Sequence, residues 1–183
     1  VEFGKQFATR VGRQTAVASD LKTAQQWQSL LREPSAAIQE DYQTSMVLLK
    51  PHALQRNLGG QIIQFFLDRG LTLAAIRAVS LSPHNADFLI QPYKGVLADY
   101  QATVESISGN SWVVQFASSG SVDALSTVRD ICGPYDPAIA KALVPKSIRA
   151  RFGEDRVKNA VHCVDVAEDS IVYPKFFFEA TDQ

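Results

Sequence analysis

The hydrophobic pattern of residues 44–166 consists of short apolar runs separated by amphipathic stretches. The apolar runs are rich in aliphatic residues and are bounded by proline, glycine or polar residues, which predicts buried β-strands. They lie at residues 45–50, 71–81, 111–117 and 160–166. The first run stops at Pro51, because proline has no amide hydrogen for a strand ladder.

The stretches between these runs have apolar residues three and four positions apart, which predicts helices. We expect the first helix to begin near Asn57 or the Gly59-Gly60 pair and to end at Arg69-Gly70, where glycine allows a left-handed cap. We expect Ser121 to cap the last helix. The predicted helices cover residues 57–70, 83–91, 94–107 and 121–133.

Residues 134–158 read as a loop, because they combine three prolines with scattered cations. The resulting order of elements is β-α-β-α-α-β-α-β. This order predicts an α+β fold of the ferredoxin-like, split βαβ kind, with a four-stranded antiparallel sheet and helices packed on it. No internal repeat of 20–50 residues is present.

Residues 1–43 differ from the rest because they are polar and rich in glutamine. Asp20 is a candidate cap for a helix with a narrow apolar stripe. This segment is either an extension lying on the domain or an arm that contacts another protein. We therefore divide the chain into an N-terminal extension or linker at 1–43 and a domain at 44–183.

Composition excludes several classes of protein. The 183-residue chain is 46% hydrophobic and 20% charged, as in globular domains, and its formal net charge is −1. This balance argues against a dedicated partner among nucleic acids or acidic membranes. No apolar run is long enough to span a membrane. The chain does not begin with Met, which leaves open that it is a fragment.

Two cysteines, Cys132 and Cys163, are too few for a disulfide framework or a cysteine-rich zinc site. We expect reduced thiols in a cytosolic compartment. The three histidines have no metal-ligand spacing, so no metal site is expected from them.

A cation-rich segment leads to one of these histidines. Arginine and lysine neutralise phosphate oxygens, and a neutral imidazole nitrogen can attack phosphorus, so this arrangement suits phosphate chemistry. The alternatives are a solvated basic surface and a half-buried structural His162. The residues of the segment are Lys146, Arg149, Arg151, Arg156, Lys158, Asn159 and His162.

Two stretches carry a resemblance to a known family. The run KPHALQRNLGG at 50–60 is similar to the strand-to-helix signature of nucleoside diphosphate kinases. Ser147-Ile-Arg149, Phe152 and the NAVH run at 159–162 resemble the stretch that ends at their phosphorylated histidine. The match covers roughly residues 43–167 and is most similar to the second kinase-like domain of the ciliary, tandem-domain branch.

The resemblance implies a role for each matching residue. His162 corresponds to the nucleophile that forms a phosphohistidine, and Mg²⁺ accompanies the nucleotide phosphates. Lys50 and Asn159 correspond to residues near the ribose and the reacting phosphate. Arg129 and Arg149 correspond to the arginines that hold the phosphates. Nucleoside di- and triphosphates are the implied ligands.

Several positions depart from the family pattern. Tyr93, with Phe88, replaces the aromatic clamp on the base, and Tyr135 stands where a small phosphate-contacting threonine is usual. Tyr173 occupies the place of the glutamate that orients the imidazole, so Glu168 or Asp169 is the hypothetical substitute. Without an orienting partner, the histidine is expected to lose rate by on the order of 10²-fold.

Two functions follow from the resemblance. The first is a nucleoside diphosphate kinase of reduced activity, which we favour, in a protein of the ciliary or flagellar axoneme, with tubulin and other axonemal proteins as partners. The second is an inactive structural protein inside the doublet microtubule that uses the kinase fold as a scaffold. Both place the protein in the cytoplasm and cytoskeleton. The apolar run at 176–178 is expected to pack onto its own domain.

Overall fold

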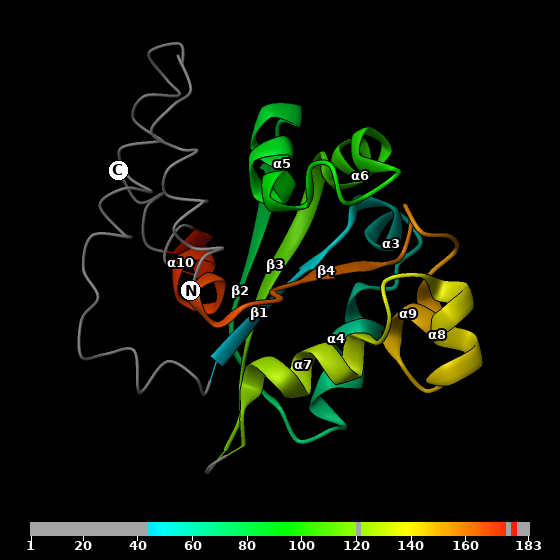
Figure 1. Ribbon diagram of the computed structural model, residues 1–183. Helices are drawn as coiled ribbons and strands as arrows, with labels where there is room; N and C mark the ends of the chain where they lie inside the picture. The colour runs from blue at the N-terminus through cyan, green and yellow to red at the C-terminus, as the bar shows by residue number, and fades with distance from the viewer. Residues whose placement is uncertain (1–43, 120–121, 175–176, 179–183) are drawn as a thin grey trace.

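The computed structural model of the protein describes residues 44–119, 122–174 and 177–178 (Figure 1). The strands are β1 (Thr44–Leu49), β2 (Thr72–Leu81), β3 (Gly109–Ala117) and β4 (Val161–Cys163). The helices are α3 (Pro51–Gln55), α4 (Gly59–Leu67), α5 (Pro83–Ile90), η3 (Gln91–Tyr93), α6 (Tyr100–Ile107), α7 (Ala124–Cys132), α8 (Pro137–Leu143), α9 (Ile148–Phe152) and α10 (Ala167–Pro174).

The four strands form one antiparallel sheet in the order β2-β3-β1-β4. Strand β1 is central, and its partner β3 follows it from Thr44 opposite Ala117 to Leu49 opposite Trp112. Among the described strands, β4 pairs with β1 alone, with His162 opposite Leu48. The split βαβ prediction is therefore confirmed.

Helices cover both faces of the sheet (Figure 1). Side chains alternate between the faces of a strand, so Met46 and Leu48 pack into one core, and Val47 and Leu49 into the other. The first core includes residues of α5, α6 and α10, and the second includes residues of α4 and α7. Because β1 is buried on both faces, its C-terminal end is a rigid support for the residue that follows it, Lys50.

The prediction that residues 134–158 form a loop is wrong. It contains α8 and α9, whose first turns are capped by side chains that accept backbone N–H bonds: Asp136 from Ala138 and Ser147 from Ala150. Helix α8 has seven residues and α9 has five, so neither is long enough to show a hydrophobic period in the sequence. Caps and tertiary packing stabilise them instead.

Other boundaries also differ. The helix predicted at 94–107 begins only at Tyr100, because Gly95 has a φ of +86° and interrupts the chain before it. The predicted strand at 160–166 is reduced to β4. Helix α7 is capped by Asp123, which accepts from the amides of Leu125 and Ser126, whereas the predicted cap, Ser121, lies outside the described residues.

The C-terminal aromatic residues that the structure describes pack on the domain, as predicted. Phe177 is buried in the first core and Phe178 packs against it, while Phe176 lies outside the described residues. The predictions for residues 1–43 also fall outside them. Among the helices that are described, none has the length and apolar character needed to cross a bilayer.

Candidate active site

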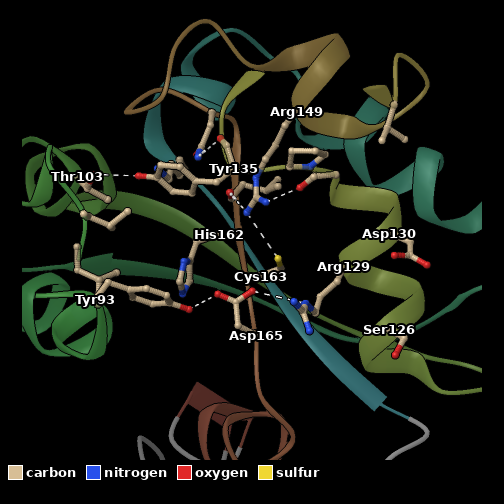
Figure 2. A pocket seen from close by; sticks show the side chains of 18 residues that line it. Tyr93, Thr103, Ser126, Arg129, Asp130, Tyr135, Arg149, His162, Cys163 and Asp165 are labelled. Atoms are coloured by element: carbon tan, nitrogen blue, oxygen red, sulfur yellow. Dashed lines mark hydrogen bonds and ion pairs between the residues drawn. The ribbon is translucent and has the colours of Figure 1, made fainter. Parts of the chain in front are cut away.

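A cavity of about 750 Å³ opens beside the C-terminal end of β1 (Figure 2). Its walls come from segments far apart in sequence, including η3, α6, the end of α7, α9 and β4. All seven site residues predicted from the sequence line it: Lys50, Tyr93, Arg129, Tyr135, Arg149, Asn159 and His162. The structure thus brings them into one place, and their individual roles stay predictions.

His162 lies in the middle of β4 and projects its partly exposed ring into the cavity (Figure 2). The ring of Tyr93 meets it edge-on, with the centroids 6.2 Å apart at 89°. Burial lowers the pKa of His162 to about 4, and the charges of Lys50 and Arg149 act in the same direction, while Asp165 opposes them. The imidazole is therefore neutral at pH 7 and keeps a nitrogen lone pair.

The turn that presents His162 is tightly constrained. Ala160 has a φ of +72°, and the Val161 amide donates across it to the Asn159 carbonyl at 3.0 Å, which makes a γ-turn. Ala160 also donates its own amide to Nε2 of His52 at 3.2 Å and accepts from the Lys50 amide at 3.0 Å. Lys50 and His52, which follow β1, therefore hold the backbone of Ala160, two residues before His162.

His52 serves this turn as a hydrogen-bond acceptor, which requires a neutral ring. Burial lowers its pKa to about 4, and the nearby charge of Lys50 adds to the effect. Its Nδ1 is buried and has no partner among the described residues. His52 does not line the cavity, so it acts on the site through the backbone.

Lys50 is 1% exposed, which is unusual for a lysine. Its Nζ donates to the Val157 carbonyl at 2.8 Å and to Ser106 Oγ at 3.2 Å. Burial lowers its pKa to about 7, and the charge of Arg149 contributes in the same direction. One of the three ammonium hydrogens is left for a ligand.

Arg149 is also buried, with 7% of its surface exposed. It donates from Nη1 to the Gly133 carbonyl at 2.7 Å and from Nη2 to the Val161 carbonyl at 3.3 Å. Its Nε is buried and has no hydrogen-bond partner among the described residues. Much of its donor capacity therefore holds the loop after α7 against β4.

Asn159 and Tyr135 form the next part of the wall. Asn159 Nδ2 donates to the Tyr135 carbonyl at 3.0 Å, while Asn159 Oδ1 is buried without a partner among the described residues. Thr103 gives its hydroxyl hydrogen to the Asp99 carbonyl, so Tyr135 is the donor in their 3.1 Å contact. The Tyr135 ring thereby bridges from the loop after α7 to α6, across one side of the cavity (Figure 2).

Asp165 is the carboxylate beside His162 that the sequence analysis missed. It accepts a short hydrogen bond from the Tyr93 hydroxyl and lies 3.7 Å from Nε of Arg129. Burial and this carboxylate raise the pKa of Tyr93 above its ordinary value, so the phenol keeps its proton. The signal that could have found Asp165 is its position three residues after His162, just beyond the strand.

Of the two hypothetical substitutes for the missing glutamate, Asp169 does not take that place. Tyr173 is buried in the first core, where its hydroxyl donates to the Leu89 carbonyl at 3.1 Å. Asp169 does not line the cavity, and nothing is described of the Glu168 side chain. Phe88 packs against the first core instead of lining the cavity, so of the two candidate aromatic residues only Tyr93 is there.

Sequence reasoning also missed several other lining residues, because neither periodicity nor motif spacing distinguishes them. Ile90, Leu97 and Val144 give the cavity an apolar side, while Thr103, Ser126 and Asp130 add polar groups. Cys163, already noted as one of two cysteines, lines the cavity next to His162.

The residues present do not form a cage for a metal ion. No group of three or more histidine, cysteine or acidic side chains within the described residues could hold one. Asp165 is engaged by Tyr93 and Arg129, which leaves the exposed carboxylate of Asp130 at the rim. This donor set fits only Mg²⁺ that is bound mainly by nucleotide phosphates, as Mg²⁺ commonly is.

A split βαβ sheet with three cations and a neutral histidine in one cavity has the features of a nucleotide-binding α+β domain. Comparison with known proteins agrees. A family model described as nucleoside diphosphate kinase matches residues 43–183. The chain therefore belongs to the nucleoside diphosphate kinase family.

Individual relatives support the assignment. The chain is 35% identical over 136 residues to nucleoside diphosphate kinase homolog 7 of Rattus norvegicus, covering 74% of this chain and 34% of the rat protein. It thus spans about a third of that relative's length. It is 30% identical over 138 residues to the nucleoside diphosphate kinase of Aquifex aeolicus, covering 75% of this chain and 95% of that protein.

Solved structures show the same fold. A crystal structure of the Aquifex aeolicus nucleoside diphosphate kinase matches with a TM-score of 0.68 at 29% identity, covering 75% of this chain and 95% of the other. The apo enzyme of Encephalitozoon cuniculi matches with a TM-score of 0.65 at 26% identity, covering 74% and 88%.

Proposed function

We propose that the protein binds a nucleoside triphosphate in this cavity and transfers its terminal phosphate to a nucleoside diphosphate through His162. The observation that carries the proposal is a neutral imidazole that shares one cavity with Lys50, Arg129 and Arg149. A lone pair supplies the nucleophile, and the cations attract the phosphate oxygens.

In the first step, an imidazole nitrogen bonds to the terminal phosphorus while the bond from that phosphorus to the bridging oxygen breaks. The nucleoside diphosphate leaves, and a second diphosphate attacks the phosphohistidine to regenerate the ring. The imidazole gains positive charge as the nitrogen–phosphorus bond forms. Asp165, whose charge favours the cationic ring, stabilises that charge.

The polar groups of the cavity that have unused hydrogen-bonding capacity are the ones that hold the substrate. One hydrogen of Lys50 Nζ and the outer guanidinium nitrogens of Arg129 are donors for phosphate oxygens. Asn159 Oδ1 is an unpaired acceptor for a sugar hydroxyl. Ile90 and Leu97 offer an apolar surface for the base. Mg²⁺ enters with the phosphates and neutralises part of their charge.

The test is phosphohistidine formation. We expect the protein, incubated with Mg²⁺ and ATP labelled on its terminal phosphate, to acquire acid-labile label that a nucleoside diphosphate then removes. His162→Ala abolishes the label, whereas His84→Ala, which changes an exposed histidine on α5 outside the cavity, keeps it. Label that survives in His162→Ala, or no label in the wild type at any protein concentration, contradicts the proposal.

A second candidate function is a structural one. Tyr135 bridges one side of the cavity, and Arg149 and Lys50 already donate to main-chain carbonyls. These contacts stabilise the domain without any ligand, as expected of a kinase fold retained as a scaffold. Absence of phosphohistidine label is the result that this function predicts, whether or not equilibrium dialysis detects bound nucleotide.

For the location of the protein, we propose the ciliary or flagellar axoneme, with tubulin and other axonemal proteins as partners. The support is the resemblance to the ciliary branch of the family and the 35% identity to homolog 7 of the rat. Co-sedimentation with doublet microtubules tests this proposal. Recovery of the protein only in the soluble fraction of axoneme-bearing cells would contradict it.

A further inference from the structure

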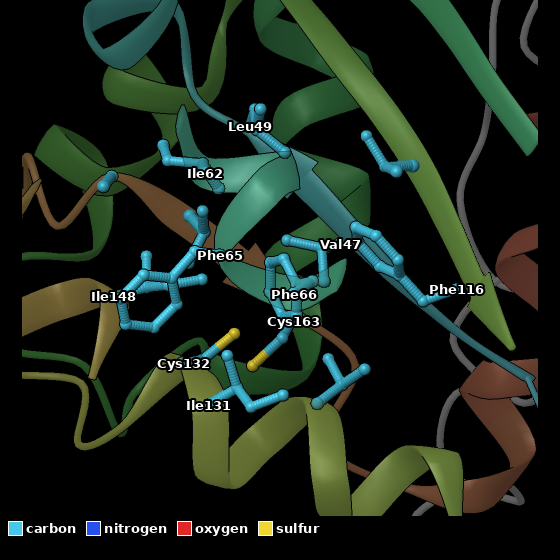
Figure 3. Packing of buried hydrophobic residues seen from close by; sticks show 14 of the residues in the cluster. Val47, Leu49, Ile62, Phe65, Phe66, Phe116, Ile131, Cys132, Ile148 and Cys163 are labelled. Carbon is cyan, nitrogen blue, oxygen red and sulfur yellow. The ribbon is translucent and has the colours of Figure 1, made fainter. Parts of the chain in front are cut away.

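The chain's two cysteines lie together beneath the cavity, although 30 residues separate them in sequence. Cys132 is the last residue of α7, and Cys163 follows His162 on β4. Both are buried free thiols in the second core, and Cys163 also lines the cavity. Figure 3 shows the two sulfur atoms directed toward each other between the helix and the strand.

Two neighbours act on the sulfur of Cys163, a guanidinium and a second thiol. Nη2 of Arg149 donates to it over 3.6 Å, and the Cys132 sulfur faces it (Figure 3). Hydrogen bonds and a nearby cation favour the thiolate, which is the nucleophilic form of cysteine. The geometry therefore makes the two cysteines unequal, with Cys163 as the acceptor that faces the cavity.

The acid–base behaviour agrees with this geometry. The hydrogen bond from Cys132 lowers the pKa of Cys163 to about 7, against the effect of burial and with the help of Arg149. Burial raises the pKa of Cys132. The thiolate therefore forms more readily on Cys163 than on Cys132.

We propose that Cys163 is a site of oxidation by hydroperoxides that enter the cavity, and that Cys132 converts the product into an intramolecular disulfide. This inference goes beyond the proposed phosphate transfer and does not depend on it. Its chemistry needs only a small peroxide, two adjacent sulfurs and the Arg149 contact.

The reaction has two steps. The Cys163 thiolate attacks one peroxide oxygen, the O–O bond breaks, and hydroxide leaves, so Cys163 becomes a sulfenic acid. The Cys132 sulfur then bonds to the Cys163 sulfur, and the sulfenic oxygen leaves as water with the Cys132 proton. The two sulfurs lose two electrons in total, and the peroxide gains them.

The experiment uses the full chain, which contains only these two cysteines. After treatment of the reduced protein with hydrogen peroxide, we expect the intact monomer to lose the mass of two hydrogens and a thiol reductant to restore it. In Cys132→Ser, dimedone should trap a sulfenic acid on Cys163, located by peptide mass spectrometry. In the matched variant Cys163→Ser, Cys132 should give no adduct under the same conditions.

A third measurement isolates the contribution of the fold. The folded chain should form the disulfide faster at pH 7 than the chain unfolded in urea, because unfolding separates the sulfurs and removes the Arg149 contact. An unchanged mass, oxidation only as intermolecular dimers, preferential adduct formation at Cys132, or equal rates in urea would each overturn the inference. None of these results bears on the labelling of His162, so the two proposals fail separately.

Discussion

At the residue scale, Tyr135 decides how much of the cavity a nucleotide can use. Its ring is partly exposed, lies with its centroid 5.8 Å from the Arg149 guanidinium carbon, and is held by the hydroxyl bond to Thr103. The backbone carbonyl of the same residue accepts from Asn159. The side chain can therefore be changed while the contact that positions Asn159 is kept.

We expect Tyr135→Thr to increase the affinity for ATP on the order of tenfold, which corresponds to about 1.4 kcal/mol. The smaller side chain makes room for phosphates and offers a hydroxyl where the family usually has one. The measurement is ATP titration by isothermal calorimetry. Tyr135→Phe is the control, because it removes only the hydroxyl and keeps the ring; equal or weaker binding by the threonine variant would contradict the prediction.

At the element scale, the short helix α9 depends on the way α7 ends. Gly133 follows α7 with a φ of +76°, and a Cβ added there would collide with the side chain of Ser147, the cap of α9. The Gly133 carbonyl also accepts from Arg149. A glycine is thus required for the backbone conformation, the close packing and the position of a site residue.

We expect Gly133→Ala to lower the free energy of unfolding by about 1–3 kcal/mol, because it adds a strained backbone conformation to a steric clash. Urea denaturation followed by circular dichroism measures the change. Gly60→Ala is the matched control, since its added Cβ meets nothing within 4 Å and alanine favours the helix. A Gly133→Ala variant as stable as the control would show that α9 can move at no cost.

At the scale of the whole molecule, two neutral histidines link stability to pH. His52 and His162 have folded-state pKa values of about 4, below the ordinary value of 6.5. Between these values the unfolded chain binds protons that the folded chain excludes. Their contribution to stability is therefore complete above about pH 6.5 and is lost as the pH falls toward 4.

We expect the free energy of unfolding to decrease by on the order of 1 kcal/mol per histidine between pH 6.5 and 5.5. Urea denaturation over this range measures it. His52→Gln keeps a side-chain acceptor for the Ala160 amide but does not titrate, so its stability should depend less steeply on pH. If the free energy of unfolding changed with pH equally steeply in the variant and the wild type, His52 would not be a group that links stability to pH.

Much of the fold could be predicted because its signals are local. The aliphatic runs located all four strands, and glycines and prolines marked several of their ends. The prediction failed for α3, α8, α9 and α10, because helices of five to eight residues carry little periodicity and are stabilised by caps and by packing against distant elements. It also overextended β4, which ends where pairing with β1 ends.

The sequence by itself predicted the order of the strands along the chain and the class of the fold, and its resemblance to the family singled out seven residues that line the cavity. Apolar periodicity and motif spacing are written within short stretches of chain, so they survive without a structure. Only the tertiary structure decided which polar groups meet: Lys50 with Val157, Arg149 with Gly133, Asp165 with Tyr93, and Cys132 with Cys163. Hydrogen bonds and charge interactions act over a few ångströms, and only folding brings such distant positions within that range.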